Sequence, residues 1–560
     1  MKADAGASVP APPAPLTPPA PTGPRAPVRA GLAVLSGLLV SLAFPSWISP
    51  GFRPWTGGVA WFALVPLLAA IEGASARRAA LVGWLAGFSS FLSVLYWILE
   101  IEQVRPWTIP AWMSVSLALG AYWGLWAAVV SRGGVRALAL VAPAAWAAIE
   151  ILRGRLFTGF PWAILGASQW AFPQVFLSAR FVGVAGVSMA VVAVNVAVWA
   201  LLRRRREAVV PLAAALVFAG GAAVLADRAG RQVDADLECS REGVRMVLLQ
   251  GAFTEEEKFT LPVAFMMRRY ERMSLVAAGS KAAGPPASPA AGRTVVMVWP
   301  ETATATDLAS DPAVADRITA LARKTRGVHL VGALWHDPQL RLYNGAFVIT
   351  RDGPVGAYYK SHLVPFGEYI PGWFRVLFPF ARKATEGVVD FTPGPGPVPV
   401  DLPDGTRVGM AVCYEAVFPE HARALALSGA QVLVNITNDS WYGRSAASFQ
   451  HALGPLARAV ENGRFLARCA NTGVSFIADP RGRPGEVLGL FEMGTLHGEM
   501  APVSTRTFYT EHGDAPVIGA LLAALALVAA GSKAAGPPAK LVAALSGLPA
   551  GRARAVPPPV

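Results

Sequence analysis

Eight apolar runs constrain what this chain can fold into. A helix that crosses the hydrocarbon core of a bilayer needs about 20 mostly apolar residues. The runs cover residues 31–45, 57–71, 79–99, 109–131, 137–152, 181–202, 209–226 and 515–530. They predict a polytopic α-helical membrane domain with about eight transmembrane helices. The composition agrees, because 54% of the residues are hydrophobic and 15% are charged, against about 25% charged in soluble domains.

The spacing of the runs divides the chain into five parts. The long stretch without such a run has ordinary globular composition and is large enough for its own core. The first residues are rich in proline and alanine, which predicts a disordered tail. The expected parts are a cytoplasmic tail (1–28), a seven-helix membrane domain (29–226), a soluble domain (227–514), a final membrane helix (515–531) and a second cytoplasmic tail (532–560).

Lysine and arginine predict the orientation of the helices, because short cytoplasmic loops are enriched in both. With a cytoplasmic N-terminus, the inner segments hold fifteen of these residues and the short outer loops hold five. This bias puts both termini inside and the soluble domain outside, which is the periplasmic side of the inner membrane in a bacterium. The net charge of +13 is therefore explained by topology, and we expect no nucleic-acid partner.

The three cysteines do not form a disulfide framework or a metal site. Cys239, Cys413 and Cys469 are an odd number of thiols, and no pair of them has metal-ligand spacing. The sequence predicts neither a bound metal nor another cofactor.

The soluble part alternates β-rich runs with helical stretches, which is typical of an α/β domain. Strands are expected at 244–249, 294–299, 328–334, 345–350, 355–359, 408–412, 431–436 and 474–478. Helices are expected at 262–277, 313–325, 419–428 and 448–470.

Three of these strands end in a chemically reactive side chain. VVMVWPE delivers Glu301, VGAYYK delivers Lys360 and GMAVC delivers Cys413. Functional sites collect at strand ends in α/β sheets. A buried carboxylate can take the proton of a thiol, and an ammonium group can stabilise the resulting anions. The alternative for each residue is structural, with the cysteine as a small core residue and the other two as strand ends.

The motifs around these residues resemble the nitrilase, or carbon–nitrogen hydrolase, superfamily. They are WPE, YYKSHLVPFGEY and VCYE, together with NITNDSWYG and ENGRFLARCANTGVS. With the predicted membrane helices and GFPW at 159–162, the chain resembles the apolipoprotein N-acyltransferase family. The resemblance implies an αββα-sandwich ectodomain. It also implies transfer of the sn-1 acyl chain of a membrane phospholipid, through a thioester, to the α-amino group of a diacylglyceryl-cysteine at an apolipoprotein N-terminus.

The resemblance also assigns roles to residues. Glu301 is the general base, Lys360 the electrostatic stabiliser and Cys413 the nucleophile. Supporting or substrate-binding positions are Glu368, Tyr414 and Glu415 in the GEY and CYE motifs, Asn344 in YNG, Trp441 in NITNDSWYG, and Phe259, where the family commonly has tryptophan.

Several aromatic residues are candidates for contact with the bilayer. Residues 370–383 mix apolar and basic side chains, so that Trp373, Phe374, Phe378 and Arg375 could enter the headgroup layer. The alternative is a helix packed on the domain core. Trp47, Trp55, Trp97 and Trp107 lie near helix ends and are interpreted as interface anchors.

Two ionisable residues keep alternative interpretations at this stage. Glu150 lies in an apolar run, so it is either a functional intramembrane carboxylate or the partner of Arg153. His451 lies near the predicted site and is interpreted as structural or as a surface residue.

The expected partners are therefore a membrane phospholipid as acyl donor, a diacylglyceryl apolipoprotein as acceptor, and the lipid bilayer. Two other functions stay open. One is a membrane-anchored amidase or nitrilase-type hydrolase, and the other is a non-enzymatic lipid-binding membrane protein. Eight spanning segments exceed what a simple anchor needs, and the three strand ends argue for an enzyme.

Overall fold

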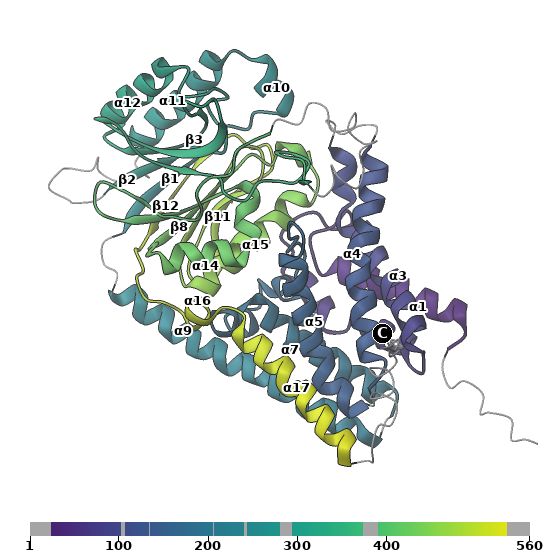
Figure 1. Cartoon of the computed structure of the whole chain (residues 1–560). Helices are drawn as coiled ribbons and strands as arrows, with labels where there is room; N and C mark the ends of the chain where they lie inside the picture. The colour runs from purple at the N-terminus through teal and green to yellow at the C-terminus, as the bar shows by residue number, and fades with distance from the viewer. Residues whose placement is uncertain are drawn as a thin grey trace, which may run out of the picture.

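A computed structural model describes residues 24–101, 107–133, 135–204, 206–239, 243–279, 294–372 and 390–534. In Figure 1 the chain forms a bundle of long helices with a layered α/β domain at one end. Both sheets lie in this domain, and the N-terminal and C-terminal helices α1 and α17 lie in the bundle.

The helices of the bundle follow the apolar runs closely. They are α1 (Ala26–Leu42), η1 (Pro54–Trp61), α2 (Val65–Ile71), α3 (Ala76–Val94), η2 (Tyr96–Glu100), α4 (Thr108–Val130), α5 (Val135–Arg155), η4 (Leu165–Gln169), α6 (Pro173–Phe176), α7 (Ala179–Leu202), η5 (Arg206–Ala208), α8 (Val209–Ala215), η6 (Leu216–Gly220), α9 (Gly221–Cys239) and α17 (Ala515–Ala534). Within the described residues, five helical stretches are long and apolar enough to cross a membrane: Pro54–Ile71, Thr108–Val130, Ala137–Arg155, Ala179–Leu202 and Val209–Glu238. Ala26–Leu42 and Ala515–Ala530 are shorter apolar helices.

Local chemistry explains where these helices depart from regular geometry. The second run is a 3-10 helix followed by the short α2, and each begins beside a proline. Gly183 interrupts α7 with φ of 67°, a conformation that glycine adopts without steric cost. The run expected to end at residue 226 contains the π-helical turn η6 and continues as helix α9 to Cys239.

Among its described residues, the soluble domain contains two six-stranded sheets. The first has the order β12-β1-β2-β3-β4-β5 and the second has the order β11-β10-β9-β8-β7-β6. The first sheet consists of β1 (Val244–Gln250), β2 (Val295–Val298), β3 (Val328–His336), β4 (Leu342–Thr350), β5 (Gly353–Tyr359) and β12 (Gly494–Met500). The second consists of β6 (Val400–Asp401), β7 (Arg407–Val412), β8 (Val432–Thr437), β9 (Leu466–Ala470), β10 (Ser475–Ala478) and β11 (Pro484–Leu488).

Helices cover the outer face of each sheet. One hydrophobic core joins the two sheets, with Met246 and Val298 on one side and Met410 and Val434 on the other. The remaining helices are α10 (Glu255–Thr260), α11 (Val263–Gly279), α12 (Pro312–Thr325), η10 (Cys413–Val417), α14 (Pro419–Leu427), η11 (Ser440–Tyr442), α15 (Ala447–Asn462) and α16 (Phe508–His512). Helices α11 and α12 lie outside the first sheet, while α14 and α15 lie between the second sheet and the bundle (Figure 1). The layers therefore form an αββα sandwich.

The expected helix at 448–470 is wrong over its last eight residues. Helix α15 ends at Asn462, where Gly463 adopts a left-handed conformation with φ of 62°. Strand β9 then begins at Leu466, and all its residues are buried. A strand buried on both faces has a continuous apolar pattern that periodicity cannot separate from a helix.

Candidate active site

Glu301 is held by hydrogen bonds to both of its carboxylate oxygens. It follows the end of β2, and its side chain is 7% exposed. Oε1 accepts a hydrogen bond from Asn344 Nδ2 at 2.8 Å, and Oε2 accepts one from the backbone N–H of Asn438 at 2.9 Å. The two donors fix the direction in which the carboxylate points.

Lys360 lies between two carboxylates. It follows β5, and its side chain is fully buried. Nζ is 2.8 Å from Glu368 Oε1 and 3.4 Å from Glu301 Oε1. Burial by itself lowers the pKa of Lys360, but Glu368 and Glu301 outweigh burial and raise this pKa above its usual value. The group therefore stays cationic across the physiological pH range.

Cys413 lies at a sharp turn after β7. Its φ is 54°, in the left-handed region, which costs a non-glycine residue about 1–2 kcal/mol. The turn continues into η10, and Cys413 is 9% exposed. Its carbonyl oxygen accepts hydrogen bonds from Asn435 Nδ2 at 3.4 Å and His451 Nε2 at 3.2 Å. These bonds hold the strained turn in place.

The thiol of Cys413 is electrostatically coupled to both other candidates. Burial raises its pKa, Glu301 raises it further, and Lys360 and a hydrogen bond with Thr437 lower it. The thiol is therefore protonated at rest and needs a base before it can act as a nucleophile. Glu301 raises the pKa of this thiol and is therefore the candidate for that base.

Glu415 braces two strand ends against each other. It is completely buried. Oε1 accepts hydrogen bonds from the Tyr358 hydroxyl, from the N–H and hydroxyl of Ser361, and from the N–H of His362, while Oε2 accepts one from the N–H of Val412. Burial alone would raise the pKa of Glu415, but His421 and these donors lower it. The carboxylate thus joins the segment after Lys360 to the strand before Cys413.

Tyr414 connects the same turn to the helical bundle. Its hydroxyl donates a hydrogen bond to the carbonyl oxygen of Gly159 at 3.2 Å. Its ring lies edge-on to Phe418 at 4.9 Å. The GFPW segment therefore lies directly beside the turn that carries the thiol.

Comparison with known proteins identifies the family of this chain. Residues 36–197 match the model described as apolipoprotein N-acyltransferase N-terminal domain, and residues 266–509 match carbon–nitrogen hydrolase. The apolipoprotein N-acyltransferase of Geobacter metallireducens is 34% identical over 520 residues, which cover 89% of this chain and 94% of that protein. The chain belongs to the apolipoprotein N-acyltransferase family. The enzyme of the same name from Methylococcus capsulatus is 32% identical and covers 87% of this chain and 93% of its own length.

Membership of the apolipoprotein N-acyltransferase family confirms the resemblance drawn from the motifs. The chain is an acyltransferase with a carbon–nitrogen hydrolase domain. The roles assigned to Glu301, Lys360 and Cys413 stay predictions, and the contacts above supply their geometry.

Lys258 is a cation of the candidate site that the sequence did not predict. Lys258 of α10 donates hydrogen bonds to Thr302 Oγ1 at 2.7 Å, Asn438 Oδ1 at 3.3 Å and the carbonyl oxygen of Glu301 at 3.4 Å. Burial lowers the pKa of Lys258, and Glu255 and Glu301 oppose that effect. Lys258 lies in the LQGAFTEEEKF motif, directly before Phe259.

A buried network behind the thiol was also not predicted. Asp439 lies 2.7 Å from Arg468 Nη2 and 2.9 Å from His451 Nδ1, and all three side chains are fully buried. Burial alone would raise the pKa of Asp439, but Arg468 and His451 hold it at about 2. The NITNDSWYG and ENGRFLARCANTGVS motifs contain two of these residues, yet their spacing did not indicate contact.

Three other predicted site residues, Asn344, Phe259 and Trp441, lie among the described residues. Asn344 also donates to Glu368 Oε1 at 3.3 Å, so it bridges both carboxylates near Lys360. Phe259 on α10 is 76% exposed and Trp441 on η11 is 39% exposed.

The membrane-interface candidates Trp373, Phe374, Arg375 and Phe378 lie outside the described residues. Among the described residues, no group of three or more His, Cys, Asp or Glu residues could hold a metal ion.

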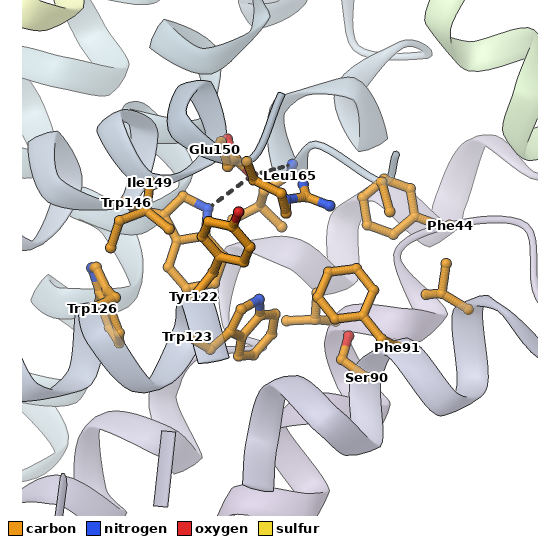
Figure 2. A pocket seen from close by; sticks show the side chains of 14 residues that line it. Phe44, Ser90, Phe91, Tyr122, Trp123, Trp126, Trp146, Ile149, Glu150 and Leu165 are labelled. Atoms are coloured by element: carbon orange, nitrogen blue, oxygen red, sulfur yellow. Dashed lines mark hydrogen bonds between the residues drawn. The ribbon is translucent and has the colours of Figure 1, made fainter. Parts of the chain in front are cut away.

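Side chains of the bundle line a small pocket (Figure 2). Aromatic side chains dominate its lining: Phe91, Tyr122, Trp123, Trp126 and Trp146. Glu150 Oε1 accepts hydrogen bonds from Trp146 Nε1 at 3.0 Å and from the N–H of Leu165 at 2.7 Å. Arg153 donates to the carbonyl oxygen of Trp162 at 2.6 Å. Both ionisable residues therefore hold the loop between α5 and η4.

One of the tryptophans interpreted as interface anchors is buried instead. Trp47, Trp55 and Trp107 are 60%, 64% and 53% exposed, as an interface anchor would be. Trp97 is 7% exposed, and its indole N–H donates to Gln450 of the soluble domain at 3.2 Å. The interpretation of Trp97 is therefore wrong, because the soluble domain covers that helix end.

Proposed function

We propose that this protein N-acylates apolipoproteins in two steps. An acyl chain moves from the sn-1 position of a membrane phospholipid to Cys413, and then to the α-amino group of an N-terminal diacylglyceryl-cysteine. The observation that carries the proposal is the contact of Lys360 with Glu301 at 3.4 Å, and it is supported by the effect of both groups on the pKa of the Cys413 thiol. The family of the chain supports the choice of substrates.

In the first step, Glu301 takes the thiol proton and the sulfur attacks the ester carbonyl carbon. The ammonium of Lys360 stabilises the negative charge that develops on the carbonyl oxygen. The C–O bond then breaks, and the departing sn-1 oxygen receives the proton from Glu301. A lysophospholipid leaves and the acyl chain remains as a thioester on Cys413.

In the second step, the neutral amine of the acceptor attacks the thioester carbon. Glu301 takes a proton from this amine, the C–S bond breaks, and the sulfur recovers the proton as a thiol. An amine attacks a thioester readily, and exclusion of water protects the intermediate from hydrolysis. The products are an N-acylated lipoprotein and the original enzyme.

The membrane part fits the same reaction, because both substrates carry acyl chains. Moving such chains into water would cost about 0.8 kcal/mol for each CH₂ group. We propose that residues 29–226 and 515–531 cross the bacterial inner membrane eight times, with the domain 227–514 in the periplasm and both termini in the cytoplasm. The segment with Trp373, Phe374, Arg375 and Phe378 would contact the lipid surface. Alkaline phosphatase fused after residue 560 should be inactive if the C-terminus is cytoplasmic, and activity would refute this topology.

The thioester is the direct test of the chemistry. The purified full chain is incubated in detergent with a phospholipid labelled on its sn-1 chain, and label released by neutral hydroxylamine is measured. We expect labelled wild type and unlabelled Cys413→Ser. The matched control is Cys469→Ala, another buried cysteine, whose sulfur contacts the carbonyl oxygen of Val298 at 3.2 Å; this variant should label like wild type.

A second addition separates acyl transfer from hydrolysis. A diacylated lipopeptide is added to the labelled enzyme, and the triacylated product is measured by mass spectrometry. Free fatty acid without this product would instead support a membrane-anchored hydrolase. No label on wild type would support a lipid-binding protein without this activity.

A further inference from the structure

Two adjacent residues of α15, Gln450 and His451, connect the helical bundle to the backbone of Cys413. Gln450 is 7% exposed and His451 is fully buried. The reaction above uses neither of them. Gln450 contacts the bundle, and His451 contacts the turn at Cys413.

Gln450 makes four hydrogen bonds to four different parts of the bundle. Oε1 accepts from the indole N–H of Trp162 at 2.8 Å and of Trp97 at 3.2 Å. Nε2 donates to the carbonyl oxygens of Pro45 at 2.7 Å and Val94 at 3.0 Å. Indoles only donate and carbonyls only accept, so the amide has one orientation, in which both its oxygen and its NH₂ group are used fully. A soluble-domain side chain thus fixes the ends of α1, α3 and η2 and the GFPW segment.

His451 contacts the backbone of Cys413, the proposed nucleophile. Its Nε2 lies 3.2 Å from the carbonyl oxygen of Cys413. That oxygen can only accept, so Nε2 carries a proton in both the neutral ring and the imidazolium. On the other side, Nδ1 lies 2.9 Å from Asp439 Oδ1 and 3.3 Å from Arg468 Nη2. The ring is therefore held from behind and donates forward to the catalytic turn.

Aromatic packing joins the two contacts. The ring of Trp162 is stacked on His451, with centroids 5.7 Å apart and an angle of 22°. Trp97 packs on Trp162 at 5.4 Å and on Tyr442 at 4.9 Å. Trp162 therefore both donates to Gln450 and supports the imidazole of His451.

The turn at Cys413 needs such support. Its left-handed backbone is strained, and a strained residue persists only where its surroundings hold it. We propose that Gln450 and His451 are positioning residues that couple the packing of the bundle to the backbone conformation of Cys413, so that the thiol is in place for attack only when Trp97 and Trp162 are packed against α15. This inference rests on the proposed function, because it assigns Cys413 the role of nucleophile.

Three variants of the full-length protein test the coupling. His451→Phe keeps a ring against Trp162 but removes the N–H that bonds Cys413. His451→Gln restores an N–H donor near that position. Gln450→Met keeps the length of the side chain and removes all four hydrogen bonds. The control is Ser448→Ala on the same helix, because Ser448 is buried and its hydroxyl makes no hydrogen bond within the described residues.

Two rates are measured for each variant, with the melting temperature. One is alkylation of Cys413 by iodoacetamide, followed on the Cys413 peptide by mass spectrometry, which requires no acyl donor. The other is single-turnover thioester formation as the phospholipid concentration is varied. A displacement of about 1 Å at a reacting atom lowers rates by about 100-fold. We expect His451→Phe and Gln450→Met to lose about this factor in the maximal rate, with little change in the half-saturating phospholipid concentration, and His451→Gln to recover most of the rate.

The outcomes separate this inference from the proposed function. A wild type that is alkylated at Cys413 but forms no thioester would refute the proposed function, while alkylation still compares the variants. Rates for His451→Phe and Gln450→Met equal to those of Ser448→Ala would overturn the coupling. A defect confined to the half-saturating concentration, or a loss of rate only in variants that have unfolded, would also overturn it.

Discussion

A methyl group at Gly332 would displace Glu301 without changing any of the side chains proposed as catalytic. Gly332 lies in β3, beside the turn that carries Glu301. A Cβ at this position would lie 2.1 Å from the carbonyl oxygen of Pro300 and 2.7 Å from the Cα of Glu301. Both are backbone atoms, so a flexible side chain cannot relieve the overlap by rotating.

The magnitude follows from these distances. Ordinary van der Waals contact begins near 3.4 Å, so Gly332→Ala must move β3 and the Glu301 turn apart by about 1.3 Å. The carbonyl oxygen of Gly332 also accepts a hydrogen bond from the N–H of Ala303 at 2.8 Å, which ties this turn to β3. Misplacement of a catalytic group by about 1 Å costs about 100-fold in rate. We expect thioester formation by Gly332→Ala to be slower by that factor.

The assay is single-turnover thioester formation from a labelled phospholipid, with the melting temperature as a check on folding. Gly356→Ala is the matched control, since Gly356 lies in β5 of the same sheet and its added methyl would only touch Val348 Cγ2 at 3.7 Å. Equal rates for folded Gly332→Ala and Gly356→Ala would refute the reasoning that Glu301 must be held at its present position.

Two further predictions concern buried carboxylates. In Glu415→Gln, the amide must turn its NH₂ toward at least one of the five donors around Glu415, and leaving that buried donor without an acceptor costs about 1–3 kcal/mol. We therefore expect a lower melting temperature and slower thioester formation. An unchanged melting temperature would contradict the bracing role. Asp439 has a folded-state pKa of about 2, held there by Arg468 and His451 against burial, and an unfolded value near 3.9. Its contribution to stability is therefore complete above about pH 4 and is lost as the pH falls from about 4 to about 2. Asp439→Asn should remove this part of the acid dependence of the free energy of unfolding, and an identical acid dependence in wild type and variant would count against the network.

Patterns within single elements were predicted well from the sequence. The apolar runs and the strands that end at Glu301, Lys360 and Cys413 are local features, so their existence did not depend on distant residues. The boundary between α15 and β9 was missed because both elements are buried and apolar. The role of Trp97 was missed because nothing near it in the sequence indicates that Gln450 lies over it.

For the site, too, local motifs predicted which residues take part but not which residues contact one another. The motifs indicated Glu368 and Glu415 as supporting residues, but not that Glu368 contacts Lys360 or that Glu415 accepts five hydrogen bonds. Lys258 and His451 had ordinary surroundings in the sequence. The contact of Lys258 with Thr302 and that of His451 with Cys413 each join segments more than thirty residues apart.

The sequence by itself determined that the chain has a large apolar helical part, an α/β domain and three reactive strand ends, because periodicity and residue type act over a few neighbours. Only the tertiary structure decided that β2 and β5 of one sheet bring Glu301 and Lys360 into contact, and that both groups shift the pKa of the Cys413 thiol, which follows β7 of the other sheet. It also decided that α15 connects the backbone of Cys413 to the bundle. The physical reason is that strand order and the stacking of two sheets set distances between residues far apart in the chain, and no local pattern carries that information.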